Sequence, residues 1–183
     1  IKVLELMLNR GRCLVSGNQV WDDVPEDFDG FEELLADYRS RLQRIVDIGV
    51  EIIAEDERGE AGFFPRPWLT VLSRGGIEAG VDLTAGQPRY NPVGVTLMGL
   101  ADTVNSLFAL RKLVFETKKV NLDEMRGILK ADWEGHELLR RSVIDKLPRY
   151  GQEHPEILAL TAEEAAHFAA CFEDHRAFYG DRF

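Results

Sequence analysis

Cysteine is scarce in this chain, and no long apolar run is present. The 183 residues include two cysteines, Cys13 and Cys171, too few for the disulfide framework of a small secreted protein. A reducing compartment is therefore expected, and the cytoplasm is the predicted location. No stretch approaches the ~20 apolar residues that a membrane-spanning helix requires, and no signal peptide is visible. Association with a membrane is not predicted.

Basic residues are also few in comparison with acidic ones. The chain has 22 Lys and Arg against 32 Asp and Glu, which gives a net charge of -10 at pH 7. Binding to nucleic acid depends on clustered positive charge, so nucleic acid is not predicted as a partner. The hydrophobic fraction of 45% and the length of 183 residues are those of a globular protein with a hydrophobic core.

Residues that commonly bind phosphate or perform hydrolysis are not arranged for those purposes. Gly75, Gly76 and Gly80 lack the preceding strand and following helix of a phosphate-binding loop. No Ser–His–Asp arrangement can be read from the spacing of these residue types. Neither class of enzyme is therefore predicted.

Three possible metal ligands occur near the end of the sequence. His167, Cys171 and His175 are four residues apart, so one continuous helix would place them on the same face. Histidine and thiolate suit zinc. Eight residues of helix span about 12 Å, however, which is too far for one ion to contact all three side chains. We predict no metal site, and a small zinc protein using His167 and Cys171 is kept as an alternative.

Helical patterns dominate the chain. Apolar spacings of three and four residues predict a long helix that begins near Asp29, with Glu32 in a capping box, and ends at Glu55–Gly59. Its predicted buried stripe is Phe31, Leu34, Leu35, Tyr38, Leu42, Ile45, Val46, Gly49, Ile52 and Ile53. Shorter helices are predicted over Ile1–Leu8, Pro67–Leu72 and Leu100–Phe115, from Asn121 with Glu124 in a capping box, from Gly135 to Lys146, and from Thr161 with Glu164 in a capping box. The predicted core tryptophans are Trp21, Trp68 and Trp133.

Two short apolar segments, Cys13–Val15 and Val93–Met98, predict strands. Strands without polar alternation are usually buried in parallel sheets, and one or two of them cannot form a sheet alone. The other strands are therefore expected outside this chain. Tyr90 and Asn91 precede the second strand, and loops at strand ends often line binding sites. We predict that they line a substrate pocket, with a structural turn as the alternative.

Short motifs occur in a compatible order along nearly the whole chain. They are Leu4-Glu5-Leu6, Phe31-Glu32-Glu33-Leu34-Leu35 with Tyr38, Asp82-Leu83-Thr84-Ala85-Gly86, Tyr90-Asn91, Gly99-Leu100-Ala101-Asp102, Asn105-Ser106-Leu107, Lys112-Leu113-Val114-Phe115, Trp133-Glu134-Gly135-His136 and Pro148-Arg149-Tyr150-Gly151. Together they resemble the glycyl radical enzymes, the family of pyruvate formate-lyase, choline trimethylamine-lyase and glycerol dehydratase. The sequence departs from the usual family pattern at Gln87, Pro92, Asn105 and Gln152-Glu153. The lyase and dehydratase branch is the most similar.

The resemblance implies an α-rich α/β fold. Residues 1–183 would form one partial domain, a segment of a ten-stranded α/β barrel that is mostly helical with one or two short strands. The family's Cys-Val-Glu loop would lie just before Ile1, and its Arg-Val-x-Gly-Tyr loop well after Phe183. Because Cys13 and Cys171 lack the Cys-Val-Glu context, no catalytic residue is assigned to this chain.

The resemblance also implies a radical chemistry. In this family an activating enzyme with an iron–sulfur cluster and S-adenosylmethionine makes a backbone glycyl radical. That radical takes hydrogen from a cysteine, and the thiyl radical takes hydrogen from a small organic substrate, which is then cleaved or undergoes elimination. The parent enzyme is expected to be a homodimer of anaerobic metabolism with a dry, closed cavity. This chain is expected to bind no cofactor and to be inert by itself.

Two other interpretations are kept. The chain could be a freestanding helical interaction module that has the family sequence without its chemistry. Within the family, the alternative to a lyase or dehydratase is a formate C-acetyltransferase.

Overall fold

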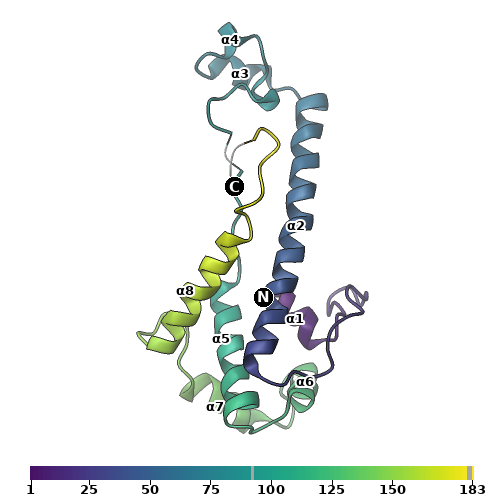
Figure 1. Ribbon diagram of the computed structural model, residues 1–183, viewed down its shortest axis with the longest axis vertical. Helices are drawn as coiled ribbons and strands as arrows, with labels where there is room; N and C mark the ends of the chain where they lie inside the picture. The colour runs from purple at the N-terminus through teal and green to yellow at the C-terminus, as the bar shows by residue number, and fades with distance from the viewer. Residues whose placement is uncertain (92, 181–182) are drawn as a thin grey trace. The chain divides into compact units, whose positions relative to one another are not determined.

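The regular structure of this protein is helical (Figure 1). The computed structural model describes residues 1–91, 93–180 and 183. In chain order the elements are α1 (Lys2–Leu8), α2 (Phe31–Phe63), α3 (Pro67–Leu72), α4 (Gly76–Ala79), the 3-10 helix η1 (Leu83–Ala85), α5 (Leu100–Leu110), the π-helical segment η2 (Arg111–Glu116), α6 (Leu122–Lys130), α7 (Glu137–Lys146) and α8 (Pro155–Ala170). The predicted helix-rich character is confirmed, while the described residues contain no barrel sheet.

The chain divides into two compact units. The first unit consists of residues 1–42 and 97–167, and the second unit consists of residues 43–96 and 168–183. The long helix α2 and the last helix α8 contribute residues to both units. Each unit has a hydrophobic cluster of its own.

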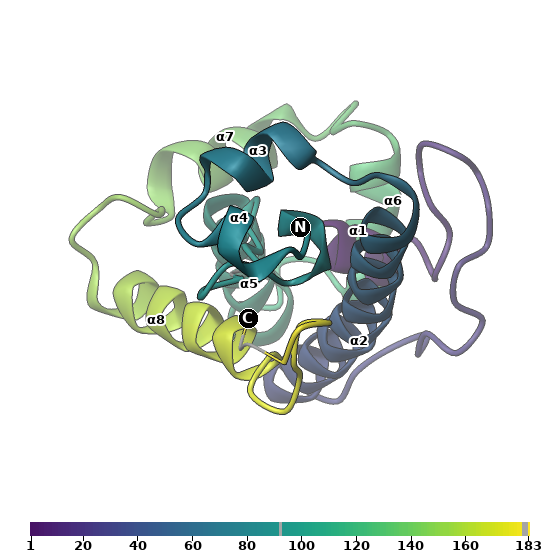
Figure 2. The same ribbon diagram turned by 90° about the horizontal axis from the view of Figure 1, so that it is seen from above.

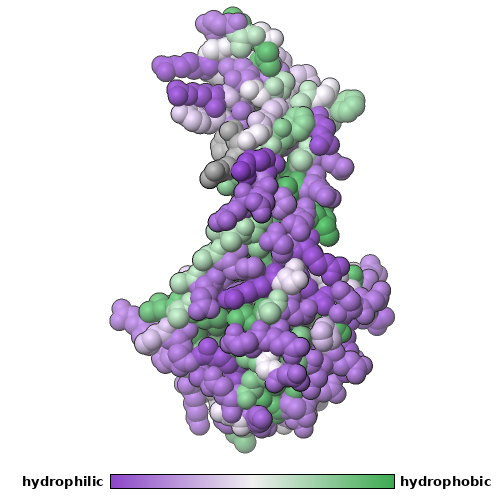
Figure 3. Space-filling model, in the orientation of Figure 1, coloured by the Kyte–Doolittle hydropathy of each residue, from purple (hydrophilic) through white to green (hydrophobic). Residues whose placement is uncertain are grey.

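The core of the first unit is built around α5. In both views α5 lies between α8 and the beginning of α2 (Figure 1 and Figure 2). Val104, Leu107 and Phe108 of α5 are fully buried, as are Leu34 of α2 and Ile157 of α8. Apolar residues three and four positions apart on α5 form one continuous face, which explains why this helix is central. On the surface of the first unit shown in Figure 3, hydrophilic side chains predominate.

A buried ion pair joins α2 to α8 within the first unit. The Arg39 guanidinium donates to Glu164 Oε1 from Nη2 at 2.6 Å and from Nε at 3.0 Å. The Glu164 side chain is only 2% exposed, and its second oxygen is buried without a hydrogen-bond partner. A carboxylate in such a place is stable only beside a fixed cation, so Arg39 determines how these two helices face each other.

The second unit has a smaller core. Val46 and Val50 of α2 are buried together with Cys171, and Phe168 and Phe172 pack against them. The rings of the two phenylalanines meet edge to face, with centroids 5.2 Å apart. Fewer buried apolar groups mean less hydrophobic stabilisation for this unit than for the first.

Several predicted helices are confirmed. The helix over Pro67–Leu72 is α3, and Pro67 lies in its first turn. The capping box before α6 is complete, because Asn121 Oδ1 accepts the Glu124 N–H and Glu124 Oε2 accepts the Asn121 N–H, both at 2.8 Å. The helix predicted over Leu100–Phe115 is present as α5 followed by η2, whose wider turns continue the same helical path.

The predicted start of the last helix is wrong. Helix α8 begins at Pro155, whose fixed φ and missing N–H suit the first turn of a helix. Thr161 therefore lies inside the helix and is no N-cap. Its hydroxyl donates to Ile157 O at 2.7 Å, one turn back.

The predicted bounds of the long helix are also wrong. Helix α2 begins at Phe31, and Glu33 rather than Glu32 accepts the Asp29 N–H, at 2.7 Å. It continues through Glu55–Gly59 to Phe63, because exposed charged residues and one glycine do not stop a helix. Pro65 does, since it disfavours helical geometry at the residue before it.

Part of the predicted buried stripe of α2 is exposed. Ile45 is exposed and Ile52 is 61% exposed, and a side chain at Gly49 would meet no atom within 4 Å. These positions fall in the second unit, where Val46 and Val50 occupy the small core instead. Periodicity identified the apolar face but not the neighbours that would cover it.

Neither predicted strand is present in the described residues. Leu14 and Val15 lie in a turn, and a single antiparallel bridge joins Arg12 to Gln19. Residues 93–98 have no regular structure. A strand is held by a ladder of backbone hydrogen bonds to a neighbouring strand. The Cys13 N–H instead donates to Asn18 O at 2.9 Å, and Cys13 O accepts the Gly17 N–H at 2.9 Å, which are contacts of a local turn.

Candidate functional site

The predicted pocket residues Tyr90 and Asn91 lie in the loop that follows η1. Tyr90 is 72% exposed, and the Arg89 guanidinium lies 5.3 Å from the centre of its ring. The Asn91 amide nitrogen donates to Pro88 O at 2.9 Å, which closes a turn. The neighbouring Pro92 lies outside the described residues. The contact made by Asn91 is a turn contact, and the pocket role of both residues stays a prediction.

A hydrogen-bonded carboxylate, Asp82, organises the start of this loop. Its oxygens accept the Arg66 N–H at 3.0 Å, the Thr70 hydroxyl at 2.9 Å, and the Thr84 N–H and hydroxyl at 3.0 and 2.7 Å. The Arg66 N–H is the largest of the contacts that hold the pKa of Asp82 well below its usual range. Sequence reasoning missed this cluster, although Asp82 precedes η1 as an N-cap residue and could have been found by that pattern.

A tyrosine covers the same loop. Gly86 has φ +84°, and a Cβ placed on it would lie 2.7 Å from Tyr179 Cδ1, so a larger residue there would displace the ring. The Tyr179 hydroxyl donates to Thr84 O. Asp82 and Tyr179 both contact Thr84 of η1, and Tyr179 also lies against Gly86, where the loop of residues 86–91 begins.

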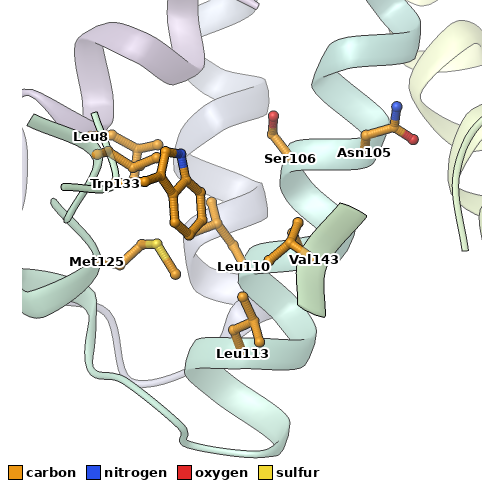
Figure 4. A pocket seen from close by; sticks show the side chains of 10 residues that line it. Leu8, Asn105, Ser106, Leu110, Leu113, Met125, Trp133 and Val143 are labelled. Carbon is orange, nitrogen blue, oxygen red and sulfur yellow. The ribbon is translucent and has the colours of Figure 1, made fainter. Parts of the chain in front are cut away.

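The first unit contains an apolar cavity of about 180 Å³ (Figure 4). Leu8 of α1, Leu110 of α5, Met125 of α6, Val143 of α7 and the indole of Trp133 line it. Trp133 has φ +65°, which is rare for a bulky residue and turns the chain so that its ring faces the cavity. The lining includes no titratable side chain, so it cannot supply acid–base catalysis.

The polar part of this cavity is formed by Asn105 and Ser106. Asn105 Oδ1 accepts the Tyr150 N–H at 2.7 Å, although the two residues are 45 positions apart. The sequence motifs around Asn105 and Tyr150 therefore meet in space. Their contact positions the turn after α7 on α5.

The possible metal ligands do not form a group. Helix α8 ends at Ala170, so His167, Cys171 and His175 do not share one helix, and the predicted common face is wrong. His167 Nε2 lies 3.3 Å from Arg39 O, and His175 Nε2 lies 2.9 Å from Asp47 Oδ1. Among the described residues, no three or more His, Cys, Asp or Glu side chains are arranged to hold a metal ion.

Cys13 has an unusual environment that sequence reasoning did not reveal. Lys2 Nζ donates to its Sγ at 3.2 Å, and the Ser16 N–H donates to it at 3.4 Å. Hydrogen bonds from the Ser16 hydroxyl and N–H, together with Lys2, lower the pKa of the Cys13 thiol to about 6. Cys13 therefore carries a thiolate at neutral pH.

A model of the pyruvate formate lyase-like family matches residues 1–183. The chain belongs to the pyruvate formate lyase-like family. Both units lie within this single match, and the predicted resemblance to glycyl radical enzymes is confirmed.

Relatives within this family are dehydratases. Over 154 residues the chain is 32% identical to trans-4-hydroxy-L-proline dehydratase of Clostridioides difficile. This alignment covers 83% of this chain and 20% of that enzyme. Over 155 residues it is 28% identical to (2S)-3-sulfopropanediol dehydratase of Klebsiella oxytoca. That alignment covers 83% of this chain and 19% of the enzyme. The chain spans about a fifth of the length of the curated relatives it matches.

A solved structure shows the same fold. The crystal structure of hydroxyproline dehydratase from Clostridioides difficile with bound trans-4-hydroxy-L-proline has a TM-score of 0.89 and 29% sequence identity. The match covers 99% of this pyruvate formate lyase-like chain and 23% of that chain. No helix in the described part of the chain is both long and apolar enough to span a membrane.

Proposed function

We propose that this chain is a segment of a longer glycyl radical enzyme of the lyase or dehydratase type. The observation that supports this most directly is the family match over all 183 residues together with the dehydratase relatives. The longer enzyme would act on a small organic substrate. Most of the residues in contact with that substrate would lie outside this chain.

The reactive positions of the proposed enzyme would also lie outside residues 1–183. Cys171 is buried in the small core of the second unit, and neither Cys171 nor Cys13 lies in a Cys-Val-Glu context, so neither is assigned the thiyl role. A glycyl radical, installed by an iron–sulfur, S-adenosylmethionine-dependent activating enzyme, would take hydrogen from a cysteine outside this chain, and that cysteine would then take hydrogen from the substrate. The residues of this chain would provide architecture, and the chain alone would be inert.

Within this proposal, the loop Gly86–Asn91 presents Tyr90 and Asn91 to the substrate pocket. The exposed ring of Tyr90 is available for such a contact, and the contacts that Asp82 and Tyr179 make with Thr84 hold η1, from which the loop starts. Residues 93–98, which lack a partner among the described residues, would become a barrel strand beside strands of the longer chain. The proposed enzyme would be a cytoplasmic homodimer.

Electron paramagnetic resonance tests the proposal. The encoding DNA is read beyond both ends, and the longer protein and the 183-residue chain are each treated anaerobically with the activating enzyme. We expect a glycyl doublet from the longer protein, with Cys-Val-Glu and Arg-Val-x-Gly-Tyr loops in its sequence, and none from the shorter chain. A doublet from the shorter chain would refute its inertness. A longer protein without either loop or doublet would favour the helical interaction module.

A further inference from the structure

Helix α3 has its polar residue inside and its apolar residues outside. Thr70 is buried, and its hydroxyl is satisfied there: it donates to Asp82 Oδ2 at 2.9 Å and accepts the Leu83 N–H at 2.9 Å. Trp68 and Leu72 are each 81% exposed. This is the reverse of a helix that faces water, and a helix with apolar residues on its outer sides is normally enclosed.

The exposed apolar surface continues on both sides of α3. The residues that form it, here named the α3 surface, are Phe63, Phe64, Trp68, Leu69, Leu72 and Ile77, and all are exposed. They lie at the end of α2, on α3 and on α4, and α3 contacts α4. Hydrophobic side chains reach the surface around α3 and α4 in Figure 3.

The size of the α3 surface indicates a binding function. An aromatic side chain can bury about 150–250 Å², so the three mostly exposed aromatic residues alone present on the order of 400 Å². With the aliphatic residues added, the area exceeds the apolar patches that a monomeric protein ordinarily leaves in water. Because the polar contacts of Thr70 fix the orientation of α3, the helix cannot turn its apolar side inward without breaking them.

The occupant is inferred from the comparison and from charge. The part of hydroxyproline dehydratase that resembles this chain, α3 and α4 included, is 23% of that enzyme's chain, so most of its polypeptide is available to pack around the matched part. An anionic membrane is disfavoured, because residues 43–96 of the same unit contain eight Asp and Glu against five Arg, although two of those arginines, Arg66 and Arg74, flank α3. The polypeptide of the same chain is thus favoured over a lipid surface.

We propose that the α3 surface is the docking surface for polypeptide of the longer chain that lies outside residues 1–183. This inference rests on the proposed function, because it requires that longer chain. Beyond the proposed function, the inference names the place of contact. Trp68 and Leu72 are at the centre of the docking surface, and the Thr70–Asp82 contacts hold α3 in place.

Hydroxyl-radical footprinting of the wild-type longer protein tests the inference without any substitution. The oxidation rate of Trp68 in the folded protein is compared with its rate in the same protein unfolded in urea. Docking predicts at least about a 10-fold protection, similar to that of Trp21, which is 6% exposed. Protection near onefold at Trp68, with Trp21 protected, would overturn the proposal.

A matched pair of substitutions gives a second test in the longer protein. Leu72→Ser and Leu138→Ser replace leucines that are 81% and 84% exposed in this structure, each in a helix. Loss of a buried leucine shifts a local opening equilibrium by about 100-fold, so Leu72→Ser should raise amide exchange in α3 and α4 by about that factor. Leu138→Ser should leave exchange in α3 and α4 unchanged. Equal exchange in these helices for the two variants would contradict the proposal.

The outcomes separate this inference from the proposed function. A glycyl doublet in a longer protein whose Trp68 is unprotected would leave the function standing and remove the docking surface. A longer protein in which Trp68 is protected but no glycyl doublet forms would support the docking surface and remove the proposed radical function. Protection of Trp68 that rises with protein concentration, together with a doubled mass, would show a second copy as the occupant and would also overturn the proposal.

Discussion

The chemistry of Cys13 is changed by its neighbours. The Ser16 hydroxyl and N–H and the Lys2 ammonium all favour its charged form, and the pKa of the thiol falls to about 6. An unperturbed cysteine has a pKa of about 8.5, so at pH 7 most of this thiol is a nucleophilic thiolate and most of an ordinary one is not.

The alkylation rate of Cys13 should therefore follow an unusual pH profile. We expect the rate with iodoacetamide to reach half of its maximum near pH 6, as measured by mass spectrometry of the labelled peptide. Ser16→Ala removes the largest contribution and should move the midpoint upward, and Lys2→Met should move it upward too. Cys171, which is buried, serves as the internal control and should stay unlabelled. A wild-type midpoint near 8.5 would contradict the assigned contacts.

At the scale of helices, the predicted capping boxes at Asn121 and Thr161 have different outcomes. Asn121 caps α6 through a reciprocal pair of hydrogen bonds, while Thr161 lies inside α8. Both residues follow the same sequence rule, with Glu three positions later. The rule applies only where the helix begins at that residue. Helix α8 begins earlier, at Pro155, so Thr161 is not at its N-terminus.

Alanine substitutions distinguish the cap from the mid-helix residue. Asn121→Ala should lower the free energy of unfolding by about 1 kcal/mol, because the Glu124 N–H loses its side-chain acceptor. Thr161→Ala should change it by less than about 0.5 kcal/mol, because alanine is the better helix former and the Ile157 carbonyl keeps its helical bond. Urea denaturation of the two variants measures the difference. A larger loss for Thr161→Ala would show that the hydroxyl contributes more than this geometry predicts.

The Asp82 contacts predict a specific response to acid. The pKa of Asp82 is lowered in the folded state, so its contribution to stability is complete above the unfolded pKa of about 3.9 and is lost as the pH falls towards the lowered folded value. The difference in urea midpoint between wild type and Asp82→Asn should be constant above about pH 5 and shrink below about pH 4. A difference that grows in acid would have the wrong sign for these contacts.

At the scale of the molecule, the two units differ in the size of their cores. The cluster of the first unit joins residues of α1, α2, α5, α6 and α8, while Val46, Val50 and Cys171 are the buried members in the second. Stability need not be uniform across a chain, and the part with fewer buried apolar contacts opens more often.

Hydrogen exchange should reveal this difference. In the 183-residue chain, amides of α3 and α4 should exchange faster than those of α5, whose inward face is fully buried. Mass spectrometry of exchanged peptides gives the comparison, with α6 as a second reference in the first unit. Equal protection of α3 and α5 would show that the units open together.

The sequence by itself determined the family and the main helices of this protein. Motif order, capping residues such as Asn121 and the three- and four-residue spacing of α5 are local or ordered along the chain, so they can be read without coordinates. The same is true of the helix over Pro67–Leu72, which proline begins.

Only the tertiary structure decided which apolar faces are covered and which distant groups meet. Trp21 and Trp68 have the same side chain, yet the first is buried and the second is exposed. Arg39 pairs with Glu164 across 125 positions, and Tyr150 meets Asn105 across 45. Burial and pairing depend on what the rest of the molecule places beside a residue, and no local pattern contains that information.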